Sequence, residues 1–312
     1  MNGSNGKQPS PREQAREALL AWYRPRRHAY PWRRPARRGA RSPDPYGVLV
    51  SEVMLQQTQA ARVAPAFEAF MVRFPDVHAL ASASCADVLR AWERLGYPRR
   101  AVALHRAAMQ IVEHHGAVVP RDPVELRALT GVGDYTADAV ASLAYGAAVA
   151  AVDTNVRRVW ARVDHAAEPD EVPARELRLA AEAWLDARRP SAWNQALMDL
   201  GREVCRPLPR CDICPLRPWC AFAAAGRPGR ASSRRQPKFE GSLRQARGSV
   251  LSALQRRSPR TLGGIERATG LSRERLAAAV AGLDRDGVVA ASAGALAGRD
   301  RGRVSLPDEP SG

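Results

Sequence analysis

The chain has 312 residues, of which 45% are hydrophobic, so it is long enough for two or three domains with substantial cores. Its formal net charge of +16 favours a polyanionic partner, most often nucleic acid. No apolar run reaches the roughly 18 residues of a membrane helix, and the polar N-terminus lacks the apolar core of a signal peptide. These features argue against a membrane protein and indicate a cytoplasmic one.

The first 225 residues predict a short tail followed by a helical domain. Residues 1–12 are polar, and we expect them to be disordered. From residue 13 to 225 the apolar residues recur with a helical period, and no convincing run shows the alternation of a strand. Residues 122–125 (DPVE) are a strong helix start, with a capping aspartate, a first-turn proline and a glutamate. The sequence therefore predicts a mostly α domain over residues 13–225.

The stretch LTGVGDYTA, residues 129–137, lies between two of the predicted helices. Gly131 and Gly133 suit a tight hairpin whose backbone approaches a partner closely. In such a helix-hairpin-helix, backbone amides reach DNA phosphates and the N-terminus of the second helix adds positive potential. We expect Leu129, Gly131, Val132 and Gly133 to contact DNA through their backbone.

The C-terminal part predicts a linker and a small module. Residues 226–240 are rich in glycine, proline, serine and arginine, which is typical of a linker, here a basic one. Residues 241–308 predict a helix, two short helices around a Gly-Leu-Ser turn, and a strand pair. This order is that of a winged helix-turn-helix. Such modules bind DNA or proteins, and the sequence favours neither.

Four of the five cysteines are clustered with the spacing C-x5-C-x2-C-x5-C: Cys205, Cys211, Cys214 and Cys220. Such clustering indicates a metal site in a reducing compartment rather than disulfides. Four thiolates so close in sequence suit a [4Fe-4S] cluster. The alternative is a structural zinc site, which often uses two C-x2-C pairs where this chain has one. Cys85 is expected to be an ordinary helix residue.

Further segments complete a recognisable pattern. They are PWR (31–33), SEVMLQQTQ (51–59), LGY (95–97), GVGDYTADAV (131–140), DTNVRRV (153–159) and NQALMDLG (194–201). With the hairpin and the cysteines, they resemble the iron–sulfur helix-hairpin-helix DNA glycosylases of the endonuclease III superfamily, and within it the MutY family. The resemblance covers about residues 15–225. It implies a two-lobed helical glycosylase core with an iron–sulfur loop at 205–220.

The same resemblance implies the function. A MutY-type enzyme acts in base excision repair on double-stranded DNA, where it flips out and hydrolyses adenine mispaired with 8-oxoguanine or guanine. We accordingly expect a bacterial, nucleoid-associated monomer.

Two carboxylates carry the implied chemistry. Glu52 has apolar neighbours on a predicted helix, so its carboxyl is either a hydrogen-bonded structural group or one with a raised pKa. The resemblance implies that Glu52 is the general acid that protonates adenine, which then leaves as the neutral base. Asp153 matches the family's catalytic aspartate, which stabilises positive charge on the sugar, and Asn155 is expected to support Asp153 or the deoxyribose. A helix cap is also a reasonable interpretation of Asp153, and the two roles are compatible.

Tyr135 matches the position where lyase-type relatives carry the lysine that attacks the sugar as a Schiff base. Lys7 and Lys238 are the only lysines in the sequence, and they lie in the predicted tail and linker. We therefore expect a monofunctional glycosylase without efficient lysine-dependent lyase activity.

The resemblance also assigns residues to DNA and to the base. Gln56 and Gln57 are expected to fill the duplex when the base flips out, while Tyr97 intercalates on the opposite strand. Residues 24–41 contain eight arginines and no acid, which suits phosphate contact or a mobile basic loop. The residues expected to border the base pocket come from two segments: Trp32, Arg33 and Gln195.

The chain departs from the family pattern in several places. The first cysteine spacing is one residue shorter than usual, Thr154 replaces a frequent glycine, and Pro98 replaces a second tyrosine. Many MutY proteins also carry a β-rich NUDIX-like domain that reads 8-oxoguanine, whereas residues 241–308 predict a different module. The opposite base is then read by this module or by the catalytic domain, or the substrate range is broader.

Two alternative functions fit these residues less well. A thymine or uracil glycosylase acting on G mismatches would not need a purine-protonating acid such as Glu52. A catalytically silent DNA-binding iron–sulfur protein would not need both Glu52 and Asp153.

Overall fold

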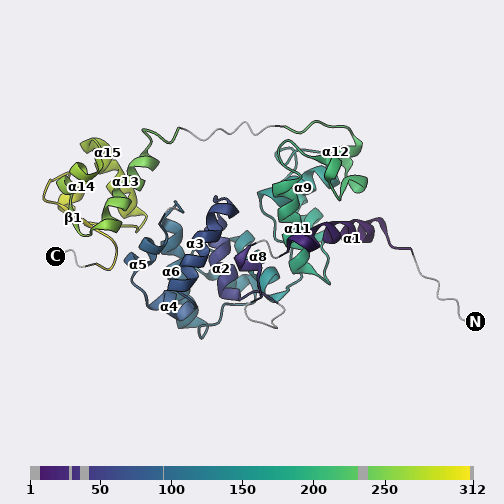
Figure 1. Ribbon diagram of the computed structural model, residues 1–312, viewed down its shortest axis with the longest axis horizontal. Coiled ribbons are helices and arrows are strands. Elements are labelled where there is room, and N and C mark those ends of the chain that lie inside the picture. The colour runs from purple at the N-terminus through teal and green to yellow at the C-terminus, as the bar shows by residue number, and fades with distance from the viewer. Residues whose placement is uncertain (1–7, 28–29, 36–41, 94, 231–237, 310–312) are drawn as a thin grey trace, which may run out of the picture. The chain divides into compact units, whose positions relative to one another are not determined.

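The computed structural model describes residues 8–27, 30–35, 42–93, 95–230 and 238–309 (Figure 1). Most of the predicted disordered tail, part of the predicted linker and part of the arginine-rich stretch lie outside the described residues. The described chain is mostly helical, which confirms the predicted fold class. Its helices include none that is both long and apolar enough to cross a membrane.

The chain forms two compact units, each built from separate stretches of sequence. The first unit comprises Met1–Glu52, Arg121–Arg127 and Val132–Ser233, and the second comprises Val53–Pro120, Ala128–Gly131 and Arg234–Gly312.

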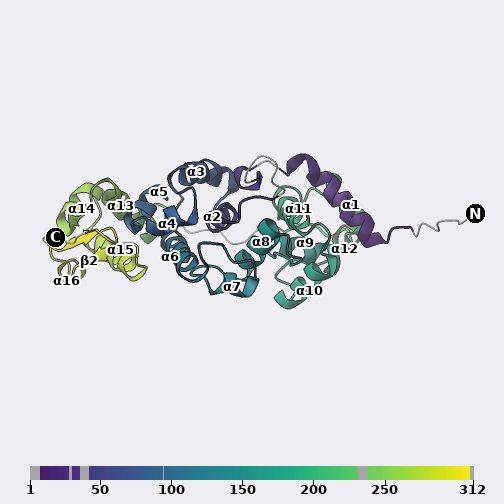
Figure 2. The same ribbon diagram turned by 90° about the horizontal axis from the view of Figure 1, so that it is seen from below.

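The first unit packs its long helices around a tryptophan cluster. Its helices are α1 (Pro11–Tyr23), η1 (Arg24–Arg26), η2 (Pro31–Arg33), most of α2 (Pro45–Leu55), α7 (Pro123–Ala128), α8 (Asp134–Tyr145), α9 (Thr154–His165), α10 (Ala174–Trp184), α11 (Pro190–Glu203), η3 (Cys211–Ile213), η4 (Arg217–Trp219) and α12 (Ala221–Ala224). Trp160 on α9 stacks on Trp184 and Trp193, with ring centroids 5.3 and 6.3 Å apart. This stack joins α9, α10 and α11, which follow α8 in the chain (Figure 2).

The second unit combines a helical part with the C-terminal module. The helical part contains α3 (Ala60–Arg73), α4 (Val77–Ser82), α5 (Cys85–Ala91) and α6 (Arg99–His114). The module contains α13 (Leu243–Arg256), β1 (Arg260–Thr261), α14 (Leu262–Thr269), α15 (Arg273–Arg285), β2 (Ala290–Ala291), α16 (Ala293–Leu296) and β3 (Arg303–Ser305). Its antiparallel sheet has the order β1-β3-β2. This element order is that of a winged helix, although the strand β1 is too short to leave a pattern in the sequence.

The C-terminal module packs against α5 of the same unit. The Gln255 side chain on α13 donates to the Leu89 carbonyl at 2.8 Å. Beyond β3, the Asp308 carboxylate accepts from the Cys85 amide at 2.9 Å, and Glu309 pairs with Arg90. Leu89 and Gln255 also line a groove of this unit.

Candidate active site

Glu52 and Tyr135 meet in the first unit although 83 residues separate them in sequence. The Glu52 side chain, on α2, is 3% exposed, and its Oε2 accepts a hydrogen bond of 2.8 Å from the Tyr135 hydroxyl, on the first turn of α8. Burial raises the pKa of Glu52 to about 7, and Asp153 adds to this rise, whereas the Tyr135 hydrogen bond opposes it. Glu52 is therefore a carboxyl that holds or releases a proton near neutral pH.

Asp153 is the N-cap residue of α9. Its carboxylate accepts from the Val156 amide at 2.7 Å and from the Asn155 side-chain amide at 2.9 Å. Burial raises the pKa of Asp153, and the two hydrogen bonds oppose that rise. The capping interpretation of Asp153 is thus correct, and Asn155 contacts this carboxylate as the sequence suggested. Capping orients the carboxylate without using all of its acceptor sites.

The residues predicted to border the base pocket are buried in a network of their own. Arg33 pairs with Asp199 through two hydrogen bonds, of 2.7 and 2.9 Å. Gln195 accepts from the Tyr23 hydroxyl at 2.9 Å. Trp32 is buried, and its ring stacks on that of Tyr30 with centroids 4.8 Å apart. Arg33 also lies close enough to Glu52 to lower its pKa.

Asn194 is a buried polar residue that the sequence reasoning missed. Its side-chain amide donates to the Ser142 hydroxyl and to the Val149 carbonyl, and its oxygen accepts from the Ala151 amide at 3.0 Å. These bonds tie α11 to α8 and to the loop that precedes Asp153. The NQALMDLG motif, which contains Asn194, was the available signal in the sequence.

The predicted hairpin is confirmed between α7 and α8. The side chains of Leu129 and Val132 are buried, so this turn presents backbone rather than side chains. Gly133 caps α8 without any side-chain hydrogen bond, which leaves first-turn amides of the helix available to an anion. Gly131 has a φ of +81°, and a Cβ there would lie 2.7 Å from the Cβ of Ala103.

Replacing Gly131 by alanine is expected to lower the melting temperature of the protein substantially. The left-handed backbone and the overlap with Ala103 together cost about 2–5 kcal/mol. Gly146→Ala is the matched control, because its φ is +71° but no atom lies within 4 Å of the added Cβ, so we expect a cost of only about 1 kcal/mol. Equal shifts of the two melting temperatures would contradict this account of the hairpin.

In the second unit, the predicted wedge residues lie on two loops held by one buried arginine. Gln57 and Tyr97 both have left-handed backbone, with φ of 56° and 48°. The Arg100 guanidinium donates to the Val53 and Met54 carbonyls at the C-terminal end of α2, at 3.0 and 2.9 Å. It also donates to the Gln56 carbonyl of the first loop and to the Gly96 carbonyl of the second, the latter at 3.1 Å. Arg100 was not predicted from the sequence. Burial lowers its pKa to about 10, which still leaves it charged at neutral pH.

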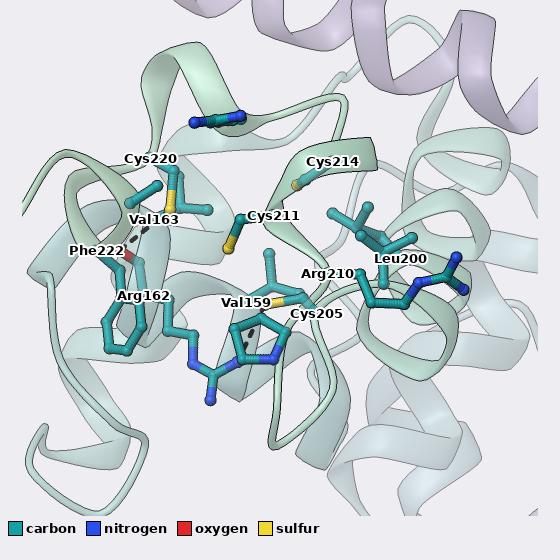
Figure 3. A pocket seen from close by; sticks show the side chains of 14 residues that line it. Val159, Arg162, Val163, Leu200, Cys205, Arg210, Cys211, Cys214, Cys220 and Phe222 are labelled. Carbon is teal, nitrogen blue, oxygen red and sulfur yellow. Dashed lines mark hydrogen bonds between the residues drawn. The ribbon is translucent and has the colours of Figure 1, made fainter. Parts of the chain in front are cut away.

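The four clustered cysteines line one pocket of the first unit (Figure 3). Cys205 follows α11, Cys211 begins η3, Cys214 follows η3, and Cys220 precedes α12. Burial raises the pKa of Cys214 to about 12 and also raises those of Cys205 and Cys220. Within the described residues, no three histidine, cysteine or acidic side chains converge closely enough to hold a single metal ion.

Two arginines of α9 hold the cysteine loop. Arg162 is buried and donates to the carbonyls of Arg206 and Pro207 at 2.6 and 2.8 Å, which braces the shortened turn after Cys205. Arg158 donates to the Cys205 carbonyl at 2.7 Å and to the Asn155 side-chain oxygen at 2.8 Å. A continuous chain of hydrogen bonds therefore runs from this loop through Asn155 to Asp153.

The comparisons with known proteins agree with this geometry. Residues 50–184 match the HhH-GPD superfamily of base excision DNA repair proteins. The adenine DNA glycosylase of Mycolicibacterium smegmatis is 44% identical over 237 residues, which cover 76% of this chain and 78% of that one. The chain belongs to the adenine DNA glycosylase family. This confirms the predicted family, so the protein is a DNA glycosylase of base excision repair and hydrolyses an N-glycosyl bond.

Solved structures also resemble this member of the adenine DNA glycosylase family. A thermostable thymine-DNA glycosylase has a TM-score of 0.60 at 27% identity, over 69% of this chain and 97% of that one. A trapped covalent complex of endonuclease III with DNA has a TM-score of 0.56 at 23% identity, over 70% and 99%. The second likeness shows the shared fold.

Proposed function

We propose that the enzyme removes adenine mispaired with 8-oxoguanine or guanine in double-stranded DNA, with Glu52 as general acid. The observation that carries this proposal is the buried Glu52 carboxyl, whose pKa of about 7 and hydrogen bond to Tyr135 suit proton transfer near neutral pH. Adenine leaves readily only when a ring nitrogen is protonated. Asp153, whose charge influences Glu52, then stabilises the positive charge that develops on deoxyribose.

We further propose that base release leaves the DNA strand intact. Tyr135 occupies the place of the lysine in lyase-type relatives, and its hydroxyl donates to Glu52. Burial raises the pKa of Tyr135 well above its usual value, so the phenol stays protonated and is a poor nucleophile. Lys238 is exposed just before α13, and Lys7 lies outside the described residues.

The proposal is tested with duplexes that contain A:8-oxoG, A:G, T:G or U:G, incubated with purified enzyme and then analysed with and without alkali. We expect alkali-labile sites from the two adenine substrates and no nicks without alkali. Nicks without alkali would contradict the monofunctional mechanism. Release from T:G or U:G alone would favour the pyrimidine activity named for the thymine-DNA glycosylase relative.

We also propose that the four cysteines hold a [4Fe-4S] cluster. The four thiols line one pocket, and four thiolates so close in sequence suit the ligand set of such a cluster. A zinc ion needs all four sulfurs at about 2.3 Å, whereas a cluster places a larger body between them. The bound cluster would supply a rigid anchor for this loop, and the chemistry at the base remains that of Glu52 and Asp153.

Purified protein is expected to be brown and to contain about four iron atoms per chain. Cys211→Ser should lower the iron content sharply, because a ligand thiolate is lost. Cys85→Ser is the control, since Cys85 is buried at the start of α5 and should leave the iron content unchanged. One zinc ion per chain in place of iron would contradict the proposal.

A further inference from the structure

The second unit contains a large groove that the glycosylase chemistry leaves unexplained. One wall is α13 of the C-terminal module, preceded by Phe239, and the other is formed by residues 57–59, Arg62, residues 92–93 and residues 95–99. The groove encloses a volume of about 1150 Å³, more than most small-molecule sites occupy. Its size therefore suits a polymer rather than a metabolite.

The groove is lined by more positive than negative side chains. Arg247 pairs with Asp286 across the base of the module. Arg62, Arg99 and Arg244 also line the groove, together with the acid Glu93, so its described lining has four arginines and two acids. A polyanion is therefore the complementary occupant.

An aromatic ring and an arginine lie beside each other on the module wall. Phe239 is 57% exposed, and the Arg244 guanidinium lies 5.3 Å from the centroid of its ring. An exposed aromatic ring beside an arginine is the pairing that binds nucleic acid through stacking and phosphate contact. Leu243, the first residue of α13, is also about half exposed.

The opposite wall contains the predicted wedge residues. Gln57 and Tyr97 line the groove themselves, and both sit on the loops that Arg100 holds. DNA that reaches these loops continues directly into the groove. The positive charge of the groove and its continuity with the wedge loops thus both indicate DNA as the occupant.

We propose that this groove binds the DNA duplex beside the flipped nucleotide, with Arg62 and Arg244 contacting phosphates from opposite walls. The C-terminal module then serves the glycosylase by completing a DNA channel through α13, instead of placing α15 in a major groove as a winged helix-turn-helix does. The identity of the bound DNA as a mispaired duplex rests on the proposed function.

The test uses the full-length protein and a fluorescent duplex in which 2′-fluoro-2′-deoxyadenosine, which resists hydrolysis, lies opposite 8-oxoguanine. Arg244→Glu is expected to raise the dissociation constant about tenfold or more at 0.1 M salt. It should also reduce the slope of log K against log salt by about one, because one phosphate contact is lost. Arg62→Glu should behave in the same way from the other wall.

Arg256→Glu is the matched control, since Arg256 is exposed on the same helix and does not line the groove. It should change the dissociation constant less than about twofold. Melting temperatures verify that each variant is folded. Equal losses for Arg244→Glu and Arg256→Glu would overturn the proposal, and so would a larger loss from Arg273→Glu on α15. Base release by the wild type is measured in parallel, so failure to release adenine counts against the proposed function alone.

Discussion

Replacing Glu52 by glutamine is expected to slow adenine release by about 10²–10⁴-fold while leaving DNA affinity within a factor of about three. Glutamine keeps the shape of the side chain and still accepts the Tyr135 hydrogen bond, but it cannot deliver a proton. Single-turnover rates on the A:8-oxoG duplex measure the loss. Glu113→Gln is the control, because Glu113 is a solvent-exposed glutamate on α6. A normal release rate in Glu52→Gln would eliminate the general-acid role.

The same carboxyl predicts the pH dependence of the wild-type rate. Glu52 must be protonated to act as an acid, so base release should fall as pH rises through about 7. Asp153 must be ionised to stabilise a cation, and its pKa is raised above the usual value. The decrease of the rate at low pH should therefore occur above the ordinary titration range of an aspartate. A rate that does not change between pH 6 and 9 would contradict the general-acid assignment of Glu52.

Glu52 also predicts a cost in stability at high pH. Its pKa is about 7 in the folded protein, whereas the ordinary pKa of the group is 4.5, so the folded state binds the proton more tightly than the unfolded state. Stability is therefore lost as pH rises from about 4.5 to about 7, by at most about 3 kcal/mol. Glu52→Gln should be more stable relative to the wild type at pH 8 than at pH 4.5, as measured by urea unfolding.

Asp153→Asn is expected to reduce adenine release by about a thousandfold, because a neutral amide cannot offset the charge on the sugar. Asparagine is as good an N-cap as aspartate, so α9 should keep its start at Thr154. The melting temperature should consequently change little. Asp153→Ala should lose both the rate and about 1 kcal/mol of stability.

Asp76→Asn is the control for Asp153→Asn. It separates the loss of the catalytic charge from the general effect of changing a capping aspartate to asparagine. Asp76 caps α4 by accepting from the Ala79 amide at 2.8 Å, just as Asp153 caps α9. Asp76→Asn should leave both release and melting temperature near wild-type values. If Asp153→Asn released adenine at the wild-type rate, Asp153 would be a helix cap and no more.

Much of the candidate chemistry could be predicted because it depends on residue type and local spacing. A glutamate within the apolar run of residues 49–55, two glycines between helices and four clustered cysteines each leave a pattern within a few residues. The mostly helical fold follows from hydrophobic period in the same way. The family resemblance added the roles of Asp153 and Tyr135, which local pattern alone left open between capping or packing and catalysis.

The partners of the buried polar groups depended on the tertiary structure. Tyr135 finds Glu52 across 83 residues and Arg33 finds Asp199 across 166, and hydrophobic period predicts which side chains are buried but not which of them meet. Arg100 and Asn194 were missed for the same reason, since each bonds to backbone groups that carry no sequence signature. The sequence by itself determined the family, the fold class and the residues able to do the chemistry. Only the packing of distant helices decided the environment of Glu52, because the pKa of a carboxyl depends on its burial and on the charges and donors brought beside it.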